Sequence, residues 1–389
     1  MKLKLYIPEN LDLNLFAGFT KAWLFKFLFV ISSIYFKRVT NKKYTKEDFI
    51  PLRQVTLGKF ILEKNVKKVR DTLIDLGIIE CDFTYCIGKK AMGYRLTPEY
   101  RESKVRAITT NREISTTSIR ASKENHRHIL NSLERVTIAP GTDEALQGLC
   151  SASIDAFNSG LISRDWIQEK RWFFAEDEKT GRVFHNVANF KKELRAYLRF
   201  NGEPMVEVDI ANCQPLLLFN FYPDKKSAEA IRYRELVENG RFYELLQSLL
   251  NQPDREKVKT PFITFLFAKS HWIIPVGEAF KKEFPELAKV IATEKREEHN
   301  ALAIALQKLE ADLVINQVVG ICKKENIPTV TIHDSLLTLP AHVERVKRIL
   351  EEECQRLYSI SATVKTKELT EPLQTEYETF TQSELELAA

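Results

Sequence analysis

The sequence lacks the features that mark a membrane protein or a disulfide-stabilised secreted protein. The longest strongly apolar run near the N-terminus spans residues 27–36, between Lys26 and Lys37. It is well short of the roughly 18 residues that a membrane helix needs. The first residues, MKLKLYIPENLDL, include acidic residues and a proline where a signal peptide would be apolar. The six cysteines form no CxxC pair. We therefore expect a cytoplasmic protein that does not contact a membrane.

The net charge of +5 is small, but its distribution is uneven. Residues 1–140 hold 26 Lys and Arg against 14 Asp and Glu, whereas the rest of the chain holds 32 against 39. A basic first third is what the phosphate backbone of a nucleic acid attracts. The alternative is a merely solvated basic surface.

Residues 15–100 predict several short helices followed by a hairpin. Asn65 can cap a helix that stops at Gly77, with an apolar stripe formed by Val66, Val69, Leu73 and Leu76. Two strand-like runs then flank a turn at residues 88–90. This order resembles a winged helix-turn-helix, which also occurs as a protein-docking module. For DNA binding, the resemblance implies the basic residues of the helix and the turn: Lys67, Lys68, Arg70, Lys89 and Lys90.

Residues 205–222, MVEVDIANCQPLLLFNFY, begin with a pattern typical of a half-buried strand. Apolar residues alternate with Glu207 and Asp209, so the two carboxylates share one face. An acidic residue at the end of a buried strand is a common position for a metal ligand, although a surface Asp is equally common there.

Residues 254–270 carry a stripe that recurs every four positions: Arg255, Lys259, Ile263 and Phe267. On a continuous helix, the two cations could hold a triphosphate and the aromatic ring could stack on a base. The alternative is an ordinary amphipathic helix. Pro261 lacks a backbone N–H, so the helix could instead start there with Thr260 as its cap, leaving both cations before it.

Residues 327–340, IPTVTIHDSLLTLP, predict two strands that meet at a tight turn. The turn carries His333, Asp334 and Ser335. A simple turn accounts for Asp and Ser but not for His.

Taken together, these segments resemble the superfamily that unites family A DNA polymerases with single-subunit, phage-type RNA polymerases. Residues 206–215 look like motif A, 255–268 like motif B and 332–340 like motif C. KTGRVF, with Arg182, is similar to the TGR segment, and ALQKLEADLVINQ, with Gln307, to the QGTAAD segment. The resemblance covers roughly residues 170–360 and implies nucleotidyl transfer on a DNA primer–template with nucleoside triphosphates.

The resemblance also implies a role for each matching residue. Asp209 and Asp334 would hold two Mg²⁺ ions, with the Ile210 carbonyl as an extra ligand. Contacts to the nucleotide would come from Arg255, Phe267, Gln214 and Lys259, the last also catalytic because it neutralises phosphate charge. Contacts to the primer–template would come from Arg182, His333 and Gln307.

Departures from the family pattern leave the product open. Gln214 stands where the DNA polymerases have a Glu that excludes a 2′-hydroxyl, and its bulk favours deoxynucleotides. The His-Asp-Ser form of motif C is closer to the RNA polymerases, and Phe267 stands where those enzymes have Tyr. On balance the pattern slightly favours a DNA polymerase. No exonuclease domain fits in the first 170 residues, so we expect no proofreading. The alternatives are an RNA polymerase or primase, and a non-catalytic DNA-binding replication initiator.

The expected fold class is α+β, with a polymerase-like palm built on a small antiparallel sheet, helical fingers and an N-terminal winged helix. The oligomeric state is left open. The expected regions are 1–105 (winged helix), 106–170 (linker and short thumb-like helices), 171–222 (first part of the palm), 223–319 (fingers) and 320–389 (second part of the palm and an acidic tail).

Overall fold

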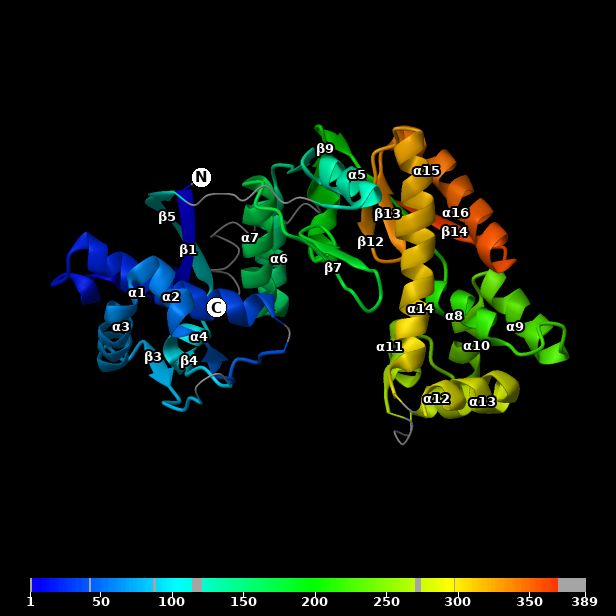
Figure 1. The fold of residues 1–389 in the computed structure, drawn as a ribbon, viewed down its shortest axis with the longest axis horizontal. Coiled ribbons are helices and arrows are strands. Elements are labelled where there is room, and N and C mark those ends of the chain that lie inside the picture. Colours follow the sequence, from blue (N-terminus) through cyan, green and yellow to red (C-terminus); the bar gives the residue numbers. More distant parts are fainter. Residues whose placement is uncertain are drawn as a thin grey trace, which may run out of the picture. The chain divides into compact units, whose positions relative to one another are not determined.

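The computed structural model describes residues 2–41, 43–86, 89–113, 121–269, 274–296 and 298–369 (Figure 1). The chain forms two compact units. Unit 1 comprises Met1–Ser118 and Gly141–Trp166, and unit 2 comprises Ile119–Pro140 and Ile167–Ala389. Within the described ranges, no helix is both long enough and apolar enough to cross a membrane.

Unit 1 combines helices with two small antiparallel sheets, one pairing β1 with β5 and one of order β2-β4-β3. Its elements are β1 (Lys2–Pro8), η1 (Leu13–Phe16), α1 (Lys21–Thr40), β2 (Ile50–Pro51), α2 (Gln54–Ile61), α3 (Glu63–Asp75), β3 (Ile79–Cys81), β4 (Gly93–Leu96), α4 (Pro98–Arg101), β5 (Val105–Glu113), α6 (Thr142–Ala152) and α7 (Ile154–Gln168), whose last two residues belong to unit 2.

Helix α3 buries the predicted apolar stripe at Val66, Val69 and Leu73. The chain leaves the helix through Gly77, whose φ of +69° is favourable for glycine. The predicted cap is wrong, because α3 begins at Glu63 after Leu62 and the Asn65 side chain donates to the Ile61 carbonyl. The predicted turn includes Gly88, which lies outside the described residues.

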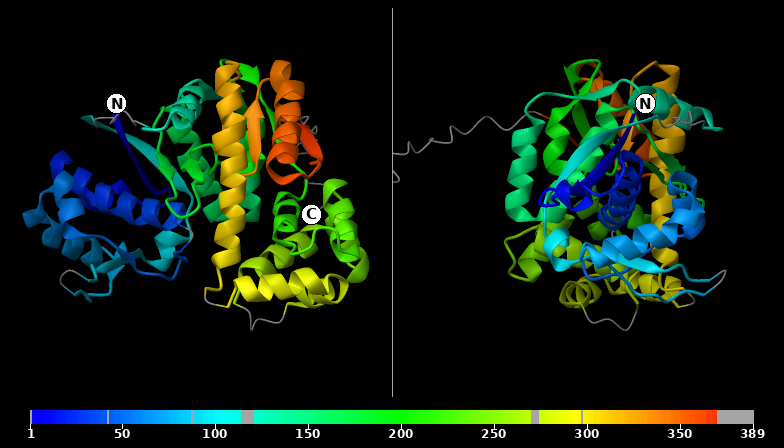
Figure 2. Two further views of the ribbon diagram at one scale, coloured as in Figure 1. Left: turned by 45° about the vertical axis from the view of Figure 1, so that its right-hand side comes forward. Right: turned by 90° about the vertical axis from the view of Figure 1, so that its left-hand side faces the viewer.

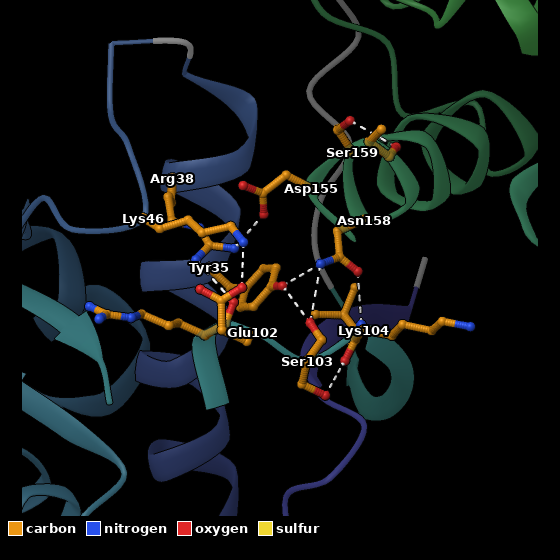
Figure 3. A network of polar contacts seen from close by, with 12 residues as sticks. Tyr35, Arg38, Lys46, Glu102, Ser103, Lys104, Asp155, Asn158 and Ser159 are labelled. Atoms are coloured by element: carbon orange, nitrogen blue, oxygen red, sulfur yellow. Dashed lines mark hydrogen bonds and ion pairs between the residues drawn. The ribbon is translucent and has the colours of Figure 1, made fainter. Parts of the chain in front are cut away.

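Helix α7 is built into unit 1 by a buried polar network (Figure 3). The Asn158 Oδ1 accepts from the Val105 amide at 2.9 Å, and its Nδ2 donates to the Tyr35 hydroxyl and the Ser103 carbonyl. On the neighbouring turn, Asp155 accepts from the Arg38 guanidinium. We expected 106–170 to be one linker and thumb-like region, but the structure divides this stretch between the two units.

Unit 2 holds the other elements of the chain, and short antiparallel sheets recur in it. Its strands are β6 (Val136–Ile138), β7 (Phe174–Glu176), β8 (Val183–His185), β9 (Leu198–Phe200), β10 (Glu203–Pro204), β11 (Val206–Ile210), β12 (Val330–Ile332), β13 (Ser335–Thr338) and β14 (Val364–Glu368). Its helices are α5 (Glu124–Leu133), η2 (Lys192–Tyr197), α8 (Cys213–Leu218), η3 (Phe219–Phe221), α9 (Ala228–Glu238), α10 (Phe242–Leu249), α11 (Glu256–Phe267), α12 (Pro275–Glu283), α13 (Pro285–Glu294), α14 (Ala301–Ala311), η4 (Asp312–Val318), α15 (Val319–Lys324), η5 (Pro340–His342) and α16 (Val343–Tyr358).

The centre of unit 2 is an antiparallel sheet of order β12-β13-β11-β14. Helix α16 packs on it and on the long helix formed by α14, η4 and α15 (Figure 2). The described residues from 223 to 318 form helices and no strand, around a cluster of aromatic rings that includes Tyr233, Phe242, Phe262 and Phe280. The predicted mixed fold with small antiparallel sheets is confirmed. The acidic tail beyond residue 369 lies outside the described part of the chain.

Candidate active site

Strand β11 presents two carboxylates on one face of the central sheet. Val206, Val208 and Ile210 are buried on its other face, while Glu207 and Asp209 are only half-buried. This is the predicted alternation, because successive side chains of a strand point to opposite faces.

The turn between β12 and β13 places a second aspartate beside the first. Ile332 pairs with Ser335, so only His333 and Asp334 form the turn. Ser335 is also the residue opposite Asp209 on the adjacent strand. His333 has a positive φ of 55°, a conformation that His tolerates better than most residues. The fold therefore brings together Asp209 and Asp334, which are 125 positions apart in the sequence.

The electrostatics of the site reflect crowding of negative charge. Burial raises the pKa of Asp209 to about 7, and the charge of Asp334 adds to the rise. Burial also raises the pKa of Asp334. The nearby cations Lys259 and Arg255 act in the opposite direction on Asp209. Strongly raised carboxyl pKa values are typical of sites that bind a cation or perform proton chemistry.

Ser335 and Glu207 complete the carboxylate face. The Ser335 hydroxyl donates to Glu207 Oε1 at 2.9 Å, and the Arg195 guanidinium lies 3.5 Å from the same oxygen. Glu207 is therefore already paired, which leaves Asp209 and Asp334 as the carboxylates available to a ligand.

Two carboxylates fit the chemistry of a magnesium site. Mg²⁺ usually takes one or two protein carboxylates together with water and substrate phosphate oxygens. A larger cluster of three or more His, Cys, Asp or Glu side chains able to hold a metal does not occur among the described residues. Ile210, the predicted source of a carbonyl ligand, is buried at the end of β11.

Helix α11 carries the predicted basic stripe as one continuous helix. It runs from Glu256 to Phe267 with Pro261 inside it, so the alternative start at Pro261 is wrong. Arg255 is the N-cap residue, and its guanidinium donates to Asn212 and lies 4.8 Å from the ring of Tyr243. Lys259 and Phe267 are half-buried, on the less buried side of the helix.

A buried cluster beside the carboxylates joins three parts of the sequence. Arg182, directly before β8, lies 2.6 Å from Glu310 Oε2, and Gln214 of α8 donates to the same oxygen at 2.5 Å. Burial, followed by the charge of Asp334, raises the pKa of Glu310 to about 7. The described residues provide no hydrogen-bond partner for four buried atoms of this region: Arg182 Nε, Glu310 Oε1, Gln214 Oε1 and Asn212 Nδ2.

Glu310 is the site residue that the sequence analysis missed. It lies in the last turn of α14, just before the π-helical segment η4, and its side chain is 2% exposed. Irregular π-helical turns are frequent at functional sites. The available signal was an acidic residue inside an apolar helical run, three positions after Gln307.

The other predicted residues of unit 2 lie on the same elements. Gln307 is half-buried on α14, one turn before Glu310. The ring of His333 lies 5.8 Å from that of Phe184 on β8, in an edge-on arrangement.

The predicted nucleic-acid residues of unit 1 do not share one surface. Lys68 packs its ammonium group 4.6 Å from the ring of Trp23 on α1. The other residues of this set line a single cleft: Lys67, Arg70, Lys89 and Lys90.

Comparisons with known proteins give a distant structural likeness. No family model matches the chain, and no curated protein matches it. Among solved structures, the POL domain of Pol1 from M. smegmatis, in complex with DNA primer–template and dNTP, is similar, with 13% sequence identity and a TM-score of 0.40. The match covers 60% of this chain and 57% of that one, so the chain spans little more than half of its length.

Proposed function

We propose that the protein is a template-directed nucleotidyltransferase. The observation that carries the proposal is the position of Asp334 in the turn directly before Ser335, the residue that pairs with Asp209 across the sheet. Asp334 is close enough for its charge to raise the pKa of Asp209. The reaction is attack of a primer 3′-hydroxyl on the α-phosphate of a nucleoside triphosphate, with release of pyrophosphate.

The carboxylates of Asp209 and Asp334 would hold two Mg²⁺ ions, with the Ile210 carbonyl as a further ligand. Bound Mg²⁺ supplies Lewis-acid activation of the attacking hydroxyl and stabilises charge on the leaving group. The protein contributes the two fixed carboxylates, whose mutual repulsion favours a bound cation.

Residues of α11 are suited to the triphosphate. The side chain of Lys259 makes no hydrogen bond or ion pair among the described residues, so its ammonium group is available to the β- and γ-phosphates. Arg255 is half-exposed at the start of the same helix and can neutralise charge beside it. Phe267, three turns further along, can stack on the base or on the template.

The primer–template is assigned to Arg182, Gln307 and His333. The Arg182 side chain is 19% exposed, its buried Nε has no hydrogen-bond partner among the described residues, and we assign it to a base edge or a sugar. Gln307 and His333 are assigned to the template and the primer terminus. Gln214 lies beside Glu310, and its bulk would obstruct the 2′-hydroxyl of a ribose. We therefore favour deoxynucleotides over ribonucleotides.

Unit 1 is proposed to be a nucleic-acid-binding module of the winged-helix type. Its order of α1, β2, α2, α3, β3 and β4 is the order of elements in such modules. The cations Lys67 and Lys68 on α3, and Lys89 and Lys90 between β3 and β4, are exposed. A protein-docking role is the alternative for this unit.

Primer extension tests the catalytic proposal. The wild-type protein, a labelled primer–template and Mg²⁺ are incubated with dNTPs or NTPs, beside Asp334→Ala and the control Asp224→Ala. The control removes an exposed carboxylate whose side chain accepts from the nearby Lys226 amide and from no proposed site residue. We expect extension with dNTPs, at least a hundred-fold less with Asp334→Ala, and no change with the control. Extension with NTPs alone would indicate an RNA polymerase or primase. Absence of any incorporation, with intact nucleic-acid binding, would indicate a non-catalytic initiator.

A further inference from the structure

Unit 1 contains a cleft that the polymerase chemistry does not use. It has a volume of about 660 Å³ and lies between the start of α2, helix α3 and the segment that joins β3 to β4. Apolar side chains such as Leu52, Val66 and Met92 form part of its wall. This size is typical of sites that enclose a small ligand or a single chemical group of a larger one.

Among the described residues, several cations and no carboxylate line the cleft. Its basic side chains are Arg53, Lys67, Arg70, Lys89 and Lys90. A second cleft of about 480 Å³ shares Arg53, Lys89 and Lys90 with the first and adds Lys37, again with no Asp or Glu. The two clefts therefore share part of their wall, and basic side chains line both.

Most of this charge is not neutralised within the protein. Arg70 is paired with Asp71, and Lys90 with Asp82. No carboxylate among the described residues pairs with Arg53, Lys67 or Lys89. Burial followed by the charge of Arg53 lowers the pKa of Lys37, which indicates that the cations repel one another. An anionic ligand would relieve this repulsion.

An aromatic side chain stands at the same cleft. Tyr85 lines it and is 62% exposed, which is unusual for so large a ring. Next to it, Phe83 is 58% exposed and has the Arg70 guanidinium 5.3 Å from its ring centre. Exposed rings beside cations are the features with which proteins hold unpaired bases, because every base has a face that can stack.

The shape distinguishes a single strand from a duplex. In a duplex, the base edges lie inside a groove and are read by a protruding helix or ribbon. A cleft that is hollowed into the protein reaches no base of a duplex, but it can accept a base that is already unpaired. The phosphates on either side of that base would then meet the uncompensated cations.

We propose that this cleft binds single-stranded nucleic acid, with a base on Tyr85 and the flanking phosphates along Arg53, Lys67 and Lys89. The inference rests on the proposed nucleic-acid binding by unit 1 and names its ligand as an unpaired strand. It does not require unit 2 to be catalytic.

Binding to the full-length chain tests the proposal. Fluorescence anisotropy in EDTA compares a labelled, unstructured 20-nucleotide DNA with a duplex of the same sequence, for wild type, Tyr85→Ala, Tyr85→Phe and Lys67→Ala. Lys59→Ala is the matched control, because it removes an exposed cation of α2 that lies outside the cleft. Thermal melts verify that each variant is folded.

We expect wild type to bind the single strand at least ten-fold more tightly than the duplex. Loss of one stacked base is worth about 1–3 kcal/mol, so Tyr85→Ala should weaken single-strand binding by roughly five-fold to more than a hundred-fold, while Tyr85→Phe should bind normally. Lys67→Ala should reduce the salt dependence by about 0.7 in log–log slope, as expected for loss of one phosphate contact.

Two results would overturn the proposal. In the first, the wild type binds the duplex as tightly as the single strand. In the second, Tyr85→Ala and Lys67→Ala bind the single strand as tightly as the control Lys59→Ala does. Photocrosslinking of wild type to an oligonucleotide containing 5-iodouracil gives a readout that needs no variant, and an absence of crosslinks at Tyr85 would also count against it. Primer extension on the same preparations separates the two proposals. If the wild type extends primers while Tyr85→Ala and Lys67→Ala bind the single strand normally, only the proposal for the cleft is refuted.

Discussion

Replacing Asp209 by Asn should stabilise the protein, in a manner that depends on pH. The pKa of Asp209 rises from its ordinary value of 3.8 to about 7 in the folded chain. The folded state therefore keeps a proton that the unfolded carboxyl has already released, so the stability of wild type falls as the pH rises from about 4 to about 7, and is level above that.

The size of the effect follows from the shift. Each unit of pKa corresponds to about 1.4 kcal/mol, so the ionised carboxylate costs about 4 kcal/mol at pH 8 as an upper limit. Solvent screens part of this at a half-buried side chain, and we expect Asp209→Asn to gain about 2 kcal/mol. At pH 5 the unfolded carboxyl is ionised but the folded one is mostly protonated, so the gain should be less than half as large.

Urea denaturation followed by circular dichroism, in EDTA at pH 5 and pH 8, measures both values. Asp224→Asn, an exposed carboxylate, is the control and should change neither. An equal gain at the two pH values, or a loss of stability at pH 8, would show that the folded chain does not raise the pKa of Asp209 in the way assigned to it.

Two further substitutions test the buried polar groups. Glu310→Ala leaves the guanidinium of Arg182 without its counter-charge and should destabilise unit 2 by about 3 kcal/mol, and Glu310→Gln, which keeps the size but also removes the charge, should cost nearly as much; a much smaller loss with Gln than with Ala would contradict the assigned ion pair. Asn158→Ala removes the acceptor of the Val105 amide within the network of Figure 3 and should cost about 2–3 kcal/mol in thermal or urea unfolding, and an unchanged midpoint would show that the network contributes nothing.

Local sequence patterns predicted the parts of the site that are themselves local. The alternation around Asp209 and the apolar runs on both sides of Asp334 are strand signals, and each strand forms where its pattern lies. The stripe that recurs every four residues was likewise sufficient to predict α11 as one continuous helix. Pro261 costs the helix one hydrogen bond but does not prevent it from continuing.

Features that depend on distant contacts were not predictable from such patterns. Glu310 looks like an ordinary polar residue of an amphipathic helix until β8 and α8 bring Arg182 and Gln214 against it. Membership of α7 in unit 1 depends on Asn158, which meets partners more than 50 positions earlier in the chain. The predicted cap of α3 was wrong for a local reason, because Leu62 adopts a positive φ that no sequence signal indicates.

The contact between Gln214 and Glu310 shows why one position of the site cannot be interpreted alone. A neutral amide at residue 214, taken by itself, suggests a cluster without negative charge. Gln214 nevertheless donates to a buried carboxylate that α14 supplies one residue before its end. The same carboxylate is the counter-charge of Arg182, so the cluster does contain a negative charge. A substitution at one position of such a cluster therefore has to be judged together with the residue that faces it, because the ion pair stabilises the cluster whichever helix provides the carboxylate.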